Sequence, residues 1–264
     1  MIVERFQSAL WETASLLLGD GAEAVLIDPG VSADEVGRVA ARARDLGLEV
    51  THVLATHADW DHVCGLAAFP AAAATMSEAT AARLAARAES ATVAERAAAS
   101  GVVIAGEPRV DRTFAPGVAL RLGPFLFETL SLPGHTPDGT AFRCRDLDLL
   151  AVGDHLSTVE FPFVTSTADY RGTLAALIDL LRRDPPGRVV PGHGPELTAT
   201  AALAVAEADL DYLWKLHDAV AAGETQEKAR APGLAVELPR PAPDDLAEAH
   251  AANVEAALAE RFGA

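Results

Sequence analysis

Apolar and polar positions along the first part of the chain follow the periods of strands and helices. Residues 15–30 predict a hairpin, because two apolar runs flank a Gly-Asp-Gly turn. Residues 32–48 predict an amphipathic helix, since Ser32 and Glu35 have the spacing of a capping box at its start. Residues 49–56 are rich in β-branched residues and predict a short buried strand. We therefore expect strand, helix and strand in succession.

The rest of the chain first continues as helix and then changes to short strands. Residues 77–100 are Ala-rich and helical by composition. Apolar runs separated by Gly, Pro or Asp then predict successive strands within 102–106, 118–122, 125–132, 140–145 and 147–154. Further along, the pattern predicts an amphipathic helix over 169–184, a strand entering a Gly-rich loop over 188–195, and mostly helix from 197 to 264, broken near 231–243.

These elements indicate an α/β protein with mixed sheets and helices on the outside. The 264 residues are enough for a sizeable core. We expect one domain over residues 1–196, because no linker interrupts it, and a helical C-terminal extension over residues 197–264 that packs on this domain or caps it.

Composition and charge exclude several classes of protein. The chain has 21 basic and 38 acidic residues, so its field repels phosphate backbones and anionic membranes. No apolar run is long enough to span a membrane, and the N-terminus lacks the pattern of a signal peptide. We therefore expect a cytoplasmic protein without nucleic-acid or membrane partners. Two cysteines form neither a disulfide framework nor a thiolate zinc site, so any metal needs nitrogen and oxygen ligands.

Polar residues follow four apolar runs at the point where each predicted strand ends. The four stretches are VLATHADWDH, LSLPGHTPDG, LLAVGDHL and VVPGHG, and five of the eight histidines lie in them. Loops at strand ends display chemistry on a rigid scaffold, and imidazole with carboxylate suits zinc, iron and manganese. The candidate metal ligands are His57, Asp59, Asp61, His62, His135, Asp154 and His193. Seven ligands are enough for two ions that share a bridging carboxylate.

The order and spacing of these stretches resemble the metallo-β-lactamase superfamily. The motifs are THxxxDH after a strand, then PGHT, GD and GHG, with LIDPG before the first of them. The resemblance covers roughly residues 10–197. It implies a four-layer αββα sandwich with a metal site at one edge between its two sheets. It also implies two divalent ions, most readily zinc, and hydrolysis by a metal-activated water in most members.

The resemblance also implies a role for each ligand. His57, residue 59 and His135 would hold one ion, whereas Asp61, His62 and His193 would hold the other, with Asp154 between them. By the same analogy Asp61 is the catalytic residue that orients the attacking water and takes its proton.

Residue 59 departs from the pattern, because most members carry His where this chain has Asp59. Three outcomes stay open. Asp59 binds the ion directly, binds it through a water, or leaves that position weak so that the other ion works alone. Direct binding makes the ligand set richer in oxygen and therefore more suitable for iron or manganese.

Several functions follow from this reading. We favour a metallohydrolase acting on a small ester, thioester or lactone. Non-haem iron oxygenase activity is the alternative, since some members oxidise sulfur at an iron held by two histidines and a carboxylate. A nuclease is less favoured, because the chain is acidic although some members linked to DNA uptake carry HxDxDH. The non-enzymatic alternative is a binding scaffold that lacks the first ion.

Other residues near the motifs are candidates for substrate contact. Packing is favoured for His155 and Tyr170, while Trp60 either lines the pocket or packs beneath its loop. Asp28 is interpreted as a turn residue, with support of the metal site as the alternative. The expected partner is a small-molecule substrate. The sequence leaves the oligomeric state open, a homodimer included.

Overall fold

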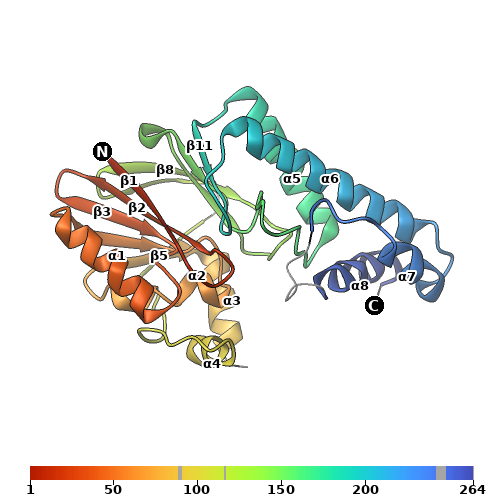
Figure 1. Cartoon of the computed structure of the whole chain (residues 1–264), viewed down its shortest axis with the longest axis horizontal. Helices are drawn as coiled ribbons and strands as arrows, with labels where there is room; N and C mark the ends of the chain where they lie inside the picture. Colours follow the sequence, from red (N-terminus) through yellow and green to blue (C-terminus); the bar gives the residue numbers. More distant parts are fainter. Residues whose placement is uncertain (89–90, 116, 242–247, 264) are drawn as a thin grey trace.

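Two β-sheets pack against each other in the structure, a computed structural model that describes residues 1–88, 91–115, 117–241 and 248–263 (Figure 1). The first sheet has six strands in chain order: β1 (Ile2–Gln7), β2 (Ala14–Asp20), β3 (Glu23–Ile27), β4 (Glu49–Leu54), β5 (Ala73–Ser77) and β6 (Arg112–Phe114). Pairing is antiparallel from β1 to β3 and parallel from β3 to β6. The carboxyl ends of β3 and β4 therefore meet at the same edge.

The second sheet has five strands in the order β11-β10-β9-β8-β7. They are β7 (Ala119–Leu122), β8 (Phe125–Ser131), β9 (Thr140–Cys144), β10 (Leu149–Ala151) and β11 (Arg188–Val190). Only β10 and β11 pair in parallel, and the helix that joins them provides the crossover that such a pair requires. A short 3-10 turn, Arg145–Leu147, separates β9 from β10.

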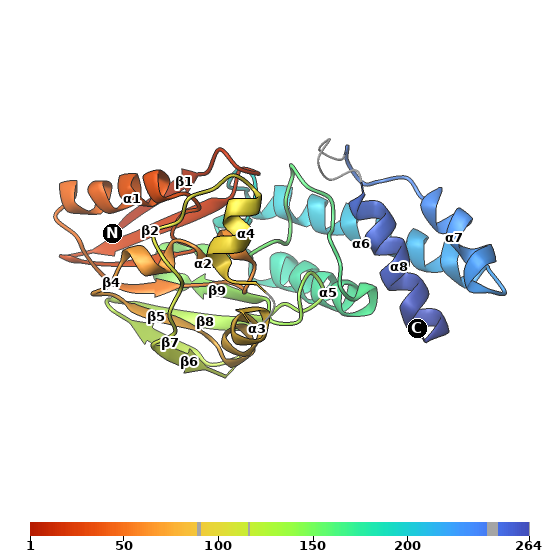
Figure 2. The same cartoon turned by 90° about the horizontal axis from the view of Figure 1, so that it is seen from below.

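Apolar side chains from both sheets fill the space between them, including Leu16, Val25, Phe127, Phe142 and Ala151. A second apolar cluster lies on the outer face of the first sheet, beneath α1 (Ala33–Asp45), α3 (Glu78–Ala88) and α4 (Val93–Ala99). A third lies outside the second sheet, beneath α5 (Thr167–Arg183) and α6 (Ala199–Ala221). The order helix, sheet, sheet, helix confirms the expected αββα sandwich; the layers follow one another in Figure 1, and Figure 2 shows the same molecule from below.

The C-terminal helices extend from one end of the sandwich, on the side of α5 (Figure 1). After α6 come α7 (Gln226–Leu234) and α8 (Ala249–Phe262), and α6 and α8 both pack against α5. Buried Tyr212, Leu216 and Val254 join these helices to the core of the second sheet. Among the residues described, no helix combines the length and apolar character needed to cross a membrane.

Local sequence signals match the structure where a cap or turn is specific. Ser32 caps α1 with both bonds of the capping box to Glu35, as expected. The helical character predicted over 77–100 is confirmed, and it is divided into two helices, because Thr92 forms a second capping box with Glu95 and begins α4. Residues 89 and 90 of that prediction lie outside the described residues.

The strand predicted over 102–106 is wrong. This segment is irregular and exposes Val103, because β6 takes the place beside β5. The first motif follows β4 and contains a short helix, α2 (Trp60–Val63), after which comes the 3-10 turn Leu66–Ala68.

Candidate metal centre

Loops from four strands converge at one edge of the sandwich, where the two sheets meet. His57 follows β4, His135 follows β8, Asp154 follows β10 and His193 follows β11. All seven predicted ligands come together there in two groups, each with its candidate ligand atoms within 4.8 Å of one another. The first group is His57, Asp59, His135 and Asp154, and the second is Asp61, His62 and His193.

The distances in the first group suit one ion. Asp154 Oδ2 lies 3.3 Å from His57 Nε2 and 3.2 Å from His135 Nε2. Asp59 Oδ2 lies 3.2 Å from His135 Nε2 and 3.6 Å from His57 Nε2. A tetrahedral ion bound at about 2.1 Å needs ligand atoms roughly 3.4 Å apart, so these four atoms match that requirement.

The second group has similar spacing and shares Asp154. His62 Nε2 lies 3.3 Å from both Asp61 Oδ2 and His193 Nε2. Asp154 Oδ1 lies 3.1 Å from His62 Nε2, whereas Oδ2 lies 3.3 Å from His193 Nε2. Asp154 is thus close to both groups, with Oδ1 near His62 and Oδ2 near the histidines of the first group and His193. His57 Nε2 is buried without a hydrogen-bond partner among the described residues, as expected of a nitrogen that binds a cation.

The outer nitrogen of each imidazole is held by another polar group, so that Nε2 points to the centre. Where the partner is a carbonyl, Nδ1–H must be the donor, which leaves a lone pair on Nε2 for an ion. The partners of Nδ1 in His57, His62, His135 and His193 are Thr56 Oγ1 at 3.0 Å, Asp28 Oδ2 at 2.9 Å, the Phe163 carbonyl at 3.0 Å and the Trp11 carbonyl at 2.9 Å.

Asp28 supports both groups from the end of β3. Its Oδ1 accepts from the Thr56 amide at 2.8 Å, and its Oδ2 accepts from the Thr56 hydroxyl at 2.8 Å as well as from His62. The hydroxyl of Thr56 in turn accepts from His57. The positive φ of Asp28, 48°, shows that it also makes the turn that we expected.

Asp59 turns one oxygen to the cluster and the other to two arginines of α3. Arg83 Nη2 lies 2.7 Å from Asp59 Oδ1, and Arg87 contacts the same oxygen. Arg83 also contacts Asp138, at 3.2 Å, and Asp138 accepts from the Ala58 amide at 2.8 Å. These contacts fix the loop that carries His57 and Asp59, and they direct Asp59 Oδ2 toward His135.

The charges in the cluster shift the pKa values of its members strongly. Burial lowers the pKa of His135, but the carboxylates of Asp154 and Asp59 outweigh it and raise this pKa to about 10. The carboxylates of Asp154, Glu160 and Asp61 likewise outweigh burial and raise the pKa of His193 to about 9. Burial acts in the opposite direction on Asp59, yet His135 and His57 hold its pKa well below the usual value. Protons and cations therefore compete for this cluster.

A cavity of about 320 Å³ lies over both groups and is lined by Asp59, Asp61, His135, Asp154 and His193. Its other walls are Trp11, Trp60, Phe163, Arg87 and Glu160. The rings of Trp11 and Trp60 meet edge to face, with centroids 5.7 Å apart. Gly192 leaves the room that Asp154 needs, since a Cβ at this position would overlap Asp154 Oδ1.

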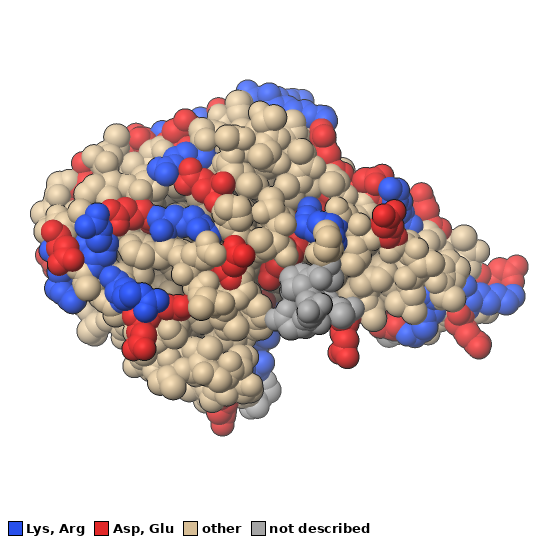
Figure 3. Space-filling view, in the orientation of Figure 1, with Lys and Arg blue, Asp and Glu red and all other residues tan. Residues whose placement is uncertain are grey.

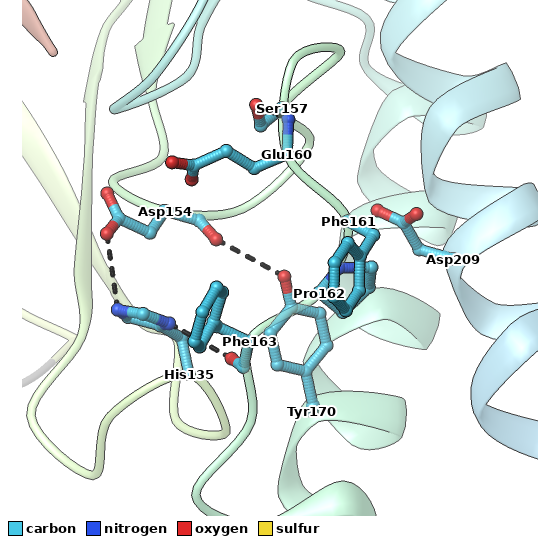
Figure 4. A pocket seen from close by; sticks show the side chains of 9 residues that line it. All are labelled: His135, Asp154, Ser157, Glu160, Phe161, Pro162, Phe163, Tyr170 and Asp209. Atoms are coloured by element: carbon cyan, nitrogen blue, oxygen red, sulfur yellow. Dashed lines mark hydrogen bonds and ion pairs between the residues drawn. The ribbon is translucent and has the colours of Figure 1, made fainter. Parts of the chain in front are cut away.

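Of the three residues considered for substrate contact, Trp60 alone lines this cavity. Tyr170 lies behind Asp154, where its hydroxyl donates to the Asp154 carbonyl at 3.2 Å and it lines a pocket of only about 10 Å³ (Figure 4). His155 is buried against the ring of Tyr170, and burial lowers its pKa to about 3. The structure therefore separates His155 and Tyr170 from the space that a substrate would enter.

Sequence reasoning missed Trp11, Arg87 and Glu160. Glu160 Oε1 lies 3.8 Å from His193 Nδ1, and burial raises the pKa of its carboxyl to about 7. Glu160 follows Asp154 in the same loop, so the rule that strand-end loops carry chemistry would have found it. No local signal marks Trp11, since an isolated bridge between Thr13 and His193 brings it to the site.

The structure is a four-layer αββα sandwich, and its candidate metal ligands lie at the edge between the two sheets, with Asp154 close to both groups. Residues 10–193, well over half the chain, match the family model of the metallo-beta-lactamase superfamily. The chain therefore belongs to this superfamily.

Two curated relatives show how varied its chemistry is. Mouse mitochondrial persulfide dioxygenase ETHE1 is 28% identical over 150 residues, which are 54% of this chain and 48% of the relative. Hydroxyacylglutathione hydrolase from Cereibacter sphaeroides is 33% identical over 126 residues, which are 48% of this chain and 42% of the relative. The chain thus spans less than half the length of the curated relatives it matches.

Solved structures show the same fold. The metallo-beta-lactamase family protein TTHA1429 from Thermus thermophilus has a TM-score of 0.67 at 18% identity, covering 99% of this chain and 92% of its own. Its match extends over the C-terminal helices. TTHA1623, solved in a di-iron-bound form, has a TM-score of 0.59 at 27% identity, covering 75% of this chain and 96% of its own.

Proposed function

We propose that this protein is a metal-dependent hydrolase that cleaves a small ester, thioester or lactone with a metal-activated water. The observation that carries the proposal is the pair of ligand groups that share Asp154 beneath one cavity. Their nitrogen and oxygen atoms suit two zinc ions, and iron or manganese also fit because Asp59 adds an oxygen.

The bound ions and the side chains around them would have different roles in the reaction. Bound divalent ions supply water with a pKa lowered from about 16 to about 7 and polarise a substrate carbonyl. Asp61 lines the cavity, and its carboxylate is the group that we assign to orient the attacking water and accept its proton. Thr13 Oγ1 lies 3.2 Å from Asp61 Oδ2 and keeps the carboxylate in place.

The cavity walls favour a small substrate with an apolar part. Trp11, Trp60 and Phe163 present aromatic surface beside the ligand groups. Aromatic walls bind apolar groups and keep bulk water away from the reacting bond. The volume of about 320 Å³ is at the low end for pockets that hold small molecules.

The second candidate is an iron-dependent oxygenase, which the match to a persulfide dioxygenase favours. His57, His135 and Asp59 offer two imidazoles and a carboxylate in one group. Iron in the purified protein with oxygen uptake on thiol or persulfide substrates would support this candidate. Zinc without oxygen uptake would exclude it.

Nuclease activity has less support. The net charge is −17, and acidic and basic side chains are intermixed over the face shown in Figure 3. A phosphate backbone is normally held by a continuous basic stripe, which this face does not show.

A substrate panel tests the proposal directly. Protein loaded with zinc, manganese or ferrous iron is offered esters, thioesters, lactones and β-lactams of different acyl size. We expect hydrolysis by the wild type and a loss of about 100-fold or more in Asp61→Asn. The control is Asp179→Asn, which alters an exposed carboxylate of α5. Metal-loaded protein that cleaves nothing in the panel would contradict the proposal.

A further inference from the structure

The loop between β10 and α5 forms one wall of the candidate metal centre. It contains Asp154 at its start, and Glu160 and Phe163 further along (Figure 4). The Phe163 carbonyl accepts a hydrogen bond from His135 Nδ1 at 3.0 Å. This bond sets the ring so that Nε2 lies 3.2 Å from both Asp59 Oδ2 and Asp154 Oδ2. The position of one peptide therefore decides the orientation of one candidate ligand.

Asn253 of α8 holds this peptide through the Val164 amide, and it holds the preceding peptide through the Pro162 carbonyl. Its Nδ2 donates to the Pro162 carbonyl at 2.6 Å, and its Oδ1 accepts from the Val164 amide at 3.0 Å. Its Nδ2 also donates to the hydroxyl of Tyr212 on α6, at 3.0 Å. The side chain is completely buried, so no water can replace these bonds without rearrangement.

Two more contacts tie the same loop to the C-terminal extension. Arg240 donates to the Glu160 carbonyl at 2.7 Å while it forms an ion pair with buried Asp209. Glu260 accepts from the hydroxyl of Thr167, where the loop enters α5, at 2.5 Å. Residues 240, 253 and 260 all lie beyond residue 193, where the match to the family model ends.

We infer that the C-terminal extension orients His135, with Asn253 as the positioning residue that acts through the Phe163 carbonyl. The inference rests on the proposed metal centre and deepens it. When the Asn253 side chain is removed, the Pro162 carbonyl and the Val164 amide lose a buried partner, and the peptide that joins the Phe163 carbonyl to the Val164 amide is free to turn. Groups that hold the outer nitrogen of a metal-ligating histidine typically affect metal affinity by about tenfold to hundredfold.

Stepwise zinc binding to the metal-free full-length protein tests the inference, with a chelating indicator as competitor. His135→Ala identifies which binding step belongs to the first group, since it removes a ligand of that group alone. We expect Asn253→Ala to weaken this step by about tenfold to hundredfold and to change the other step by less than about threefold. Leu258→Ala is the control for lost packing, because Leu258 is fully buried on the same helix. It should lower the melting temperature and leave both affinities unchanged.

Arg240→Met provides an independent variant should Asn253→Ala fail to fold. It releases the Glu160 carbonyl on the same loop, and we expect a smaller loss at the same binding step. Wild-type affinities at both steps in whichever of these variants folds would overturn the inference and leave the metal centre intact. Wild-type protein that takes up no zinc would overturn the proposed function, and the inference with it.

Discussion

Arg83 and Asp59 form an ion pair beside the candidate metal centre, with Arg83 Nη2 2.7 Å from Asp59 Oδ1. This pair involves the residue for which the sequence left three alternatives open. One oxygen of Asp59 is neutralised by guanidinium groups, whereas the other lies 3.2 Å from His135 Nε2. We therefore propose that Asp59 binds an ion directly through Oδ2, which is the first of the three alternatives that the sequence left open.

Replacing Asp59 by Ala should remove one ion and keep the other. The change deletes one of four ligand atoms in the first group and leaves the second group complete. We expect elemental analysis to show two ions per chain in the wild type and one in Asp59→Ala. Two retained ions would show that Asp59 is not needed as a ligand.

Asp28→Asn should weaken the binding of both ions, whereas Asn253→Ala should weaken the binding of one. Asp28 holds His62 directly and His57 through Thr56, so both groups lose support. We expect affinity losses of about tenfold to hundredfold at both binding steps, measured with the same chelator competition. Asp148→Asn is the matched control, because Asp148 also makes a turn with positive φ but belongs to neither group. Equal metal affinities of the two variants at both binding steps would show that Asp28 acts only as a turn residue.

Metal binding should release protons and weaken as the pH falls. A bound imidazole must be neutral, but the pKa values of His135 and His193 are raised to about 10 and about 9 in the cluster. Below these values a cation has to displace protons, so its affinity rises with pH. Between pH of about 6.5 and 8.5, calorimetry in buffers of different ionisation enthalpy should detect the released protons. A binding constant independent of pH would contradict these shifts.

Trp60→Ala should affect substrate binding more than turnover. Trp60 forms an aromatic wall with Trp11 and is not one of the ligand residues. We expect KM to rise by about tenfold for substrates with a bulky apolar acyl group and to change little for acetyl substrates. Trp214→Ala is the control, since Trp214 is 48% exposed on α6 and does not line this cavity. Equal KM changes for both acyl sizes would exclude the proposed apolar contact.

The sequence was informative wherever a residue's position along a strand decides its position in space. His57, His135 and His193 each follow a strand, and strands that run in the same direction in one sheet, such as β8, β10 and β11, end at a common edge. The grouping of the ligands at strand ends could therefore be expected from the sequence, whereas the αββα sandwich was predicted from the resemblance of the four motifs to the metallo-β-lactamase superfamily. Residues 77–100 were correctly expected to be helical, but their division into α3 and α4 was not predicted, because most of them are Ala, Arg and Glu and only Thr92 with Glu95 marks the second start.

The residues that support the candidate ligands could not be predicted from the sequence, because they act through tertiary contacts. Arg83 and Arg87 look like solvent-exposed residues of an Ala-rich helix, yet that helix packs beside the first motif. Asn253 is one of several polar residues in another Ala-rich helix, and the loop that it contacts is about 90 residues away along the chain. No local sequence pattern predicts such tertiary contacts.

Elemental analysis of the folded protein is the most direct test of the central claim that seven side chains from four loops hold divalent ions. The protein is purified, stripped with a chelator, and incubated with zinc, manganese or ferrous iron before analysis. The account predicts two ions per chain for at least one of these metals. A folded chain that retains none of them would contradict it.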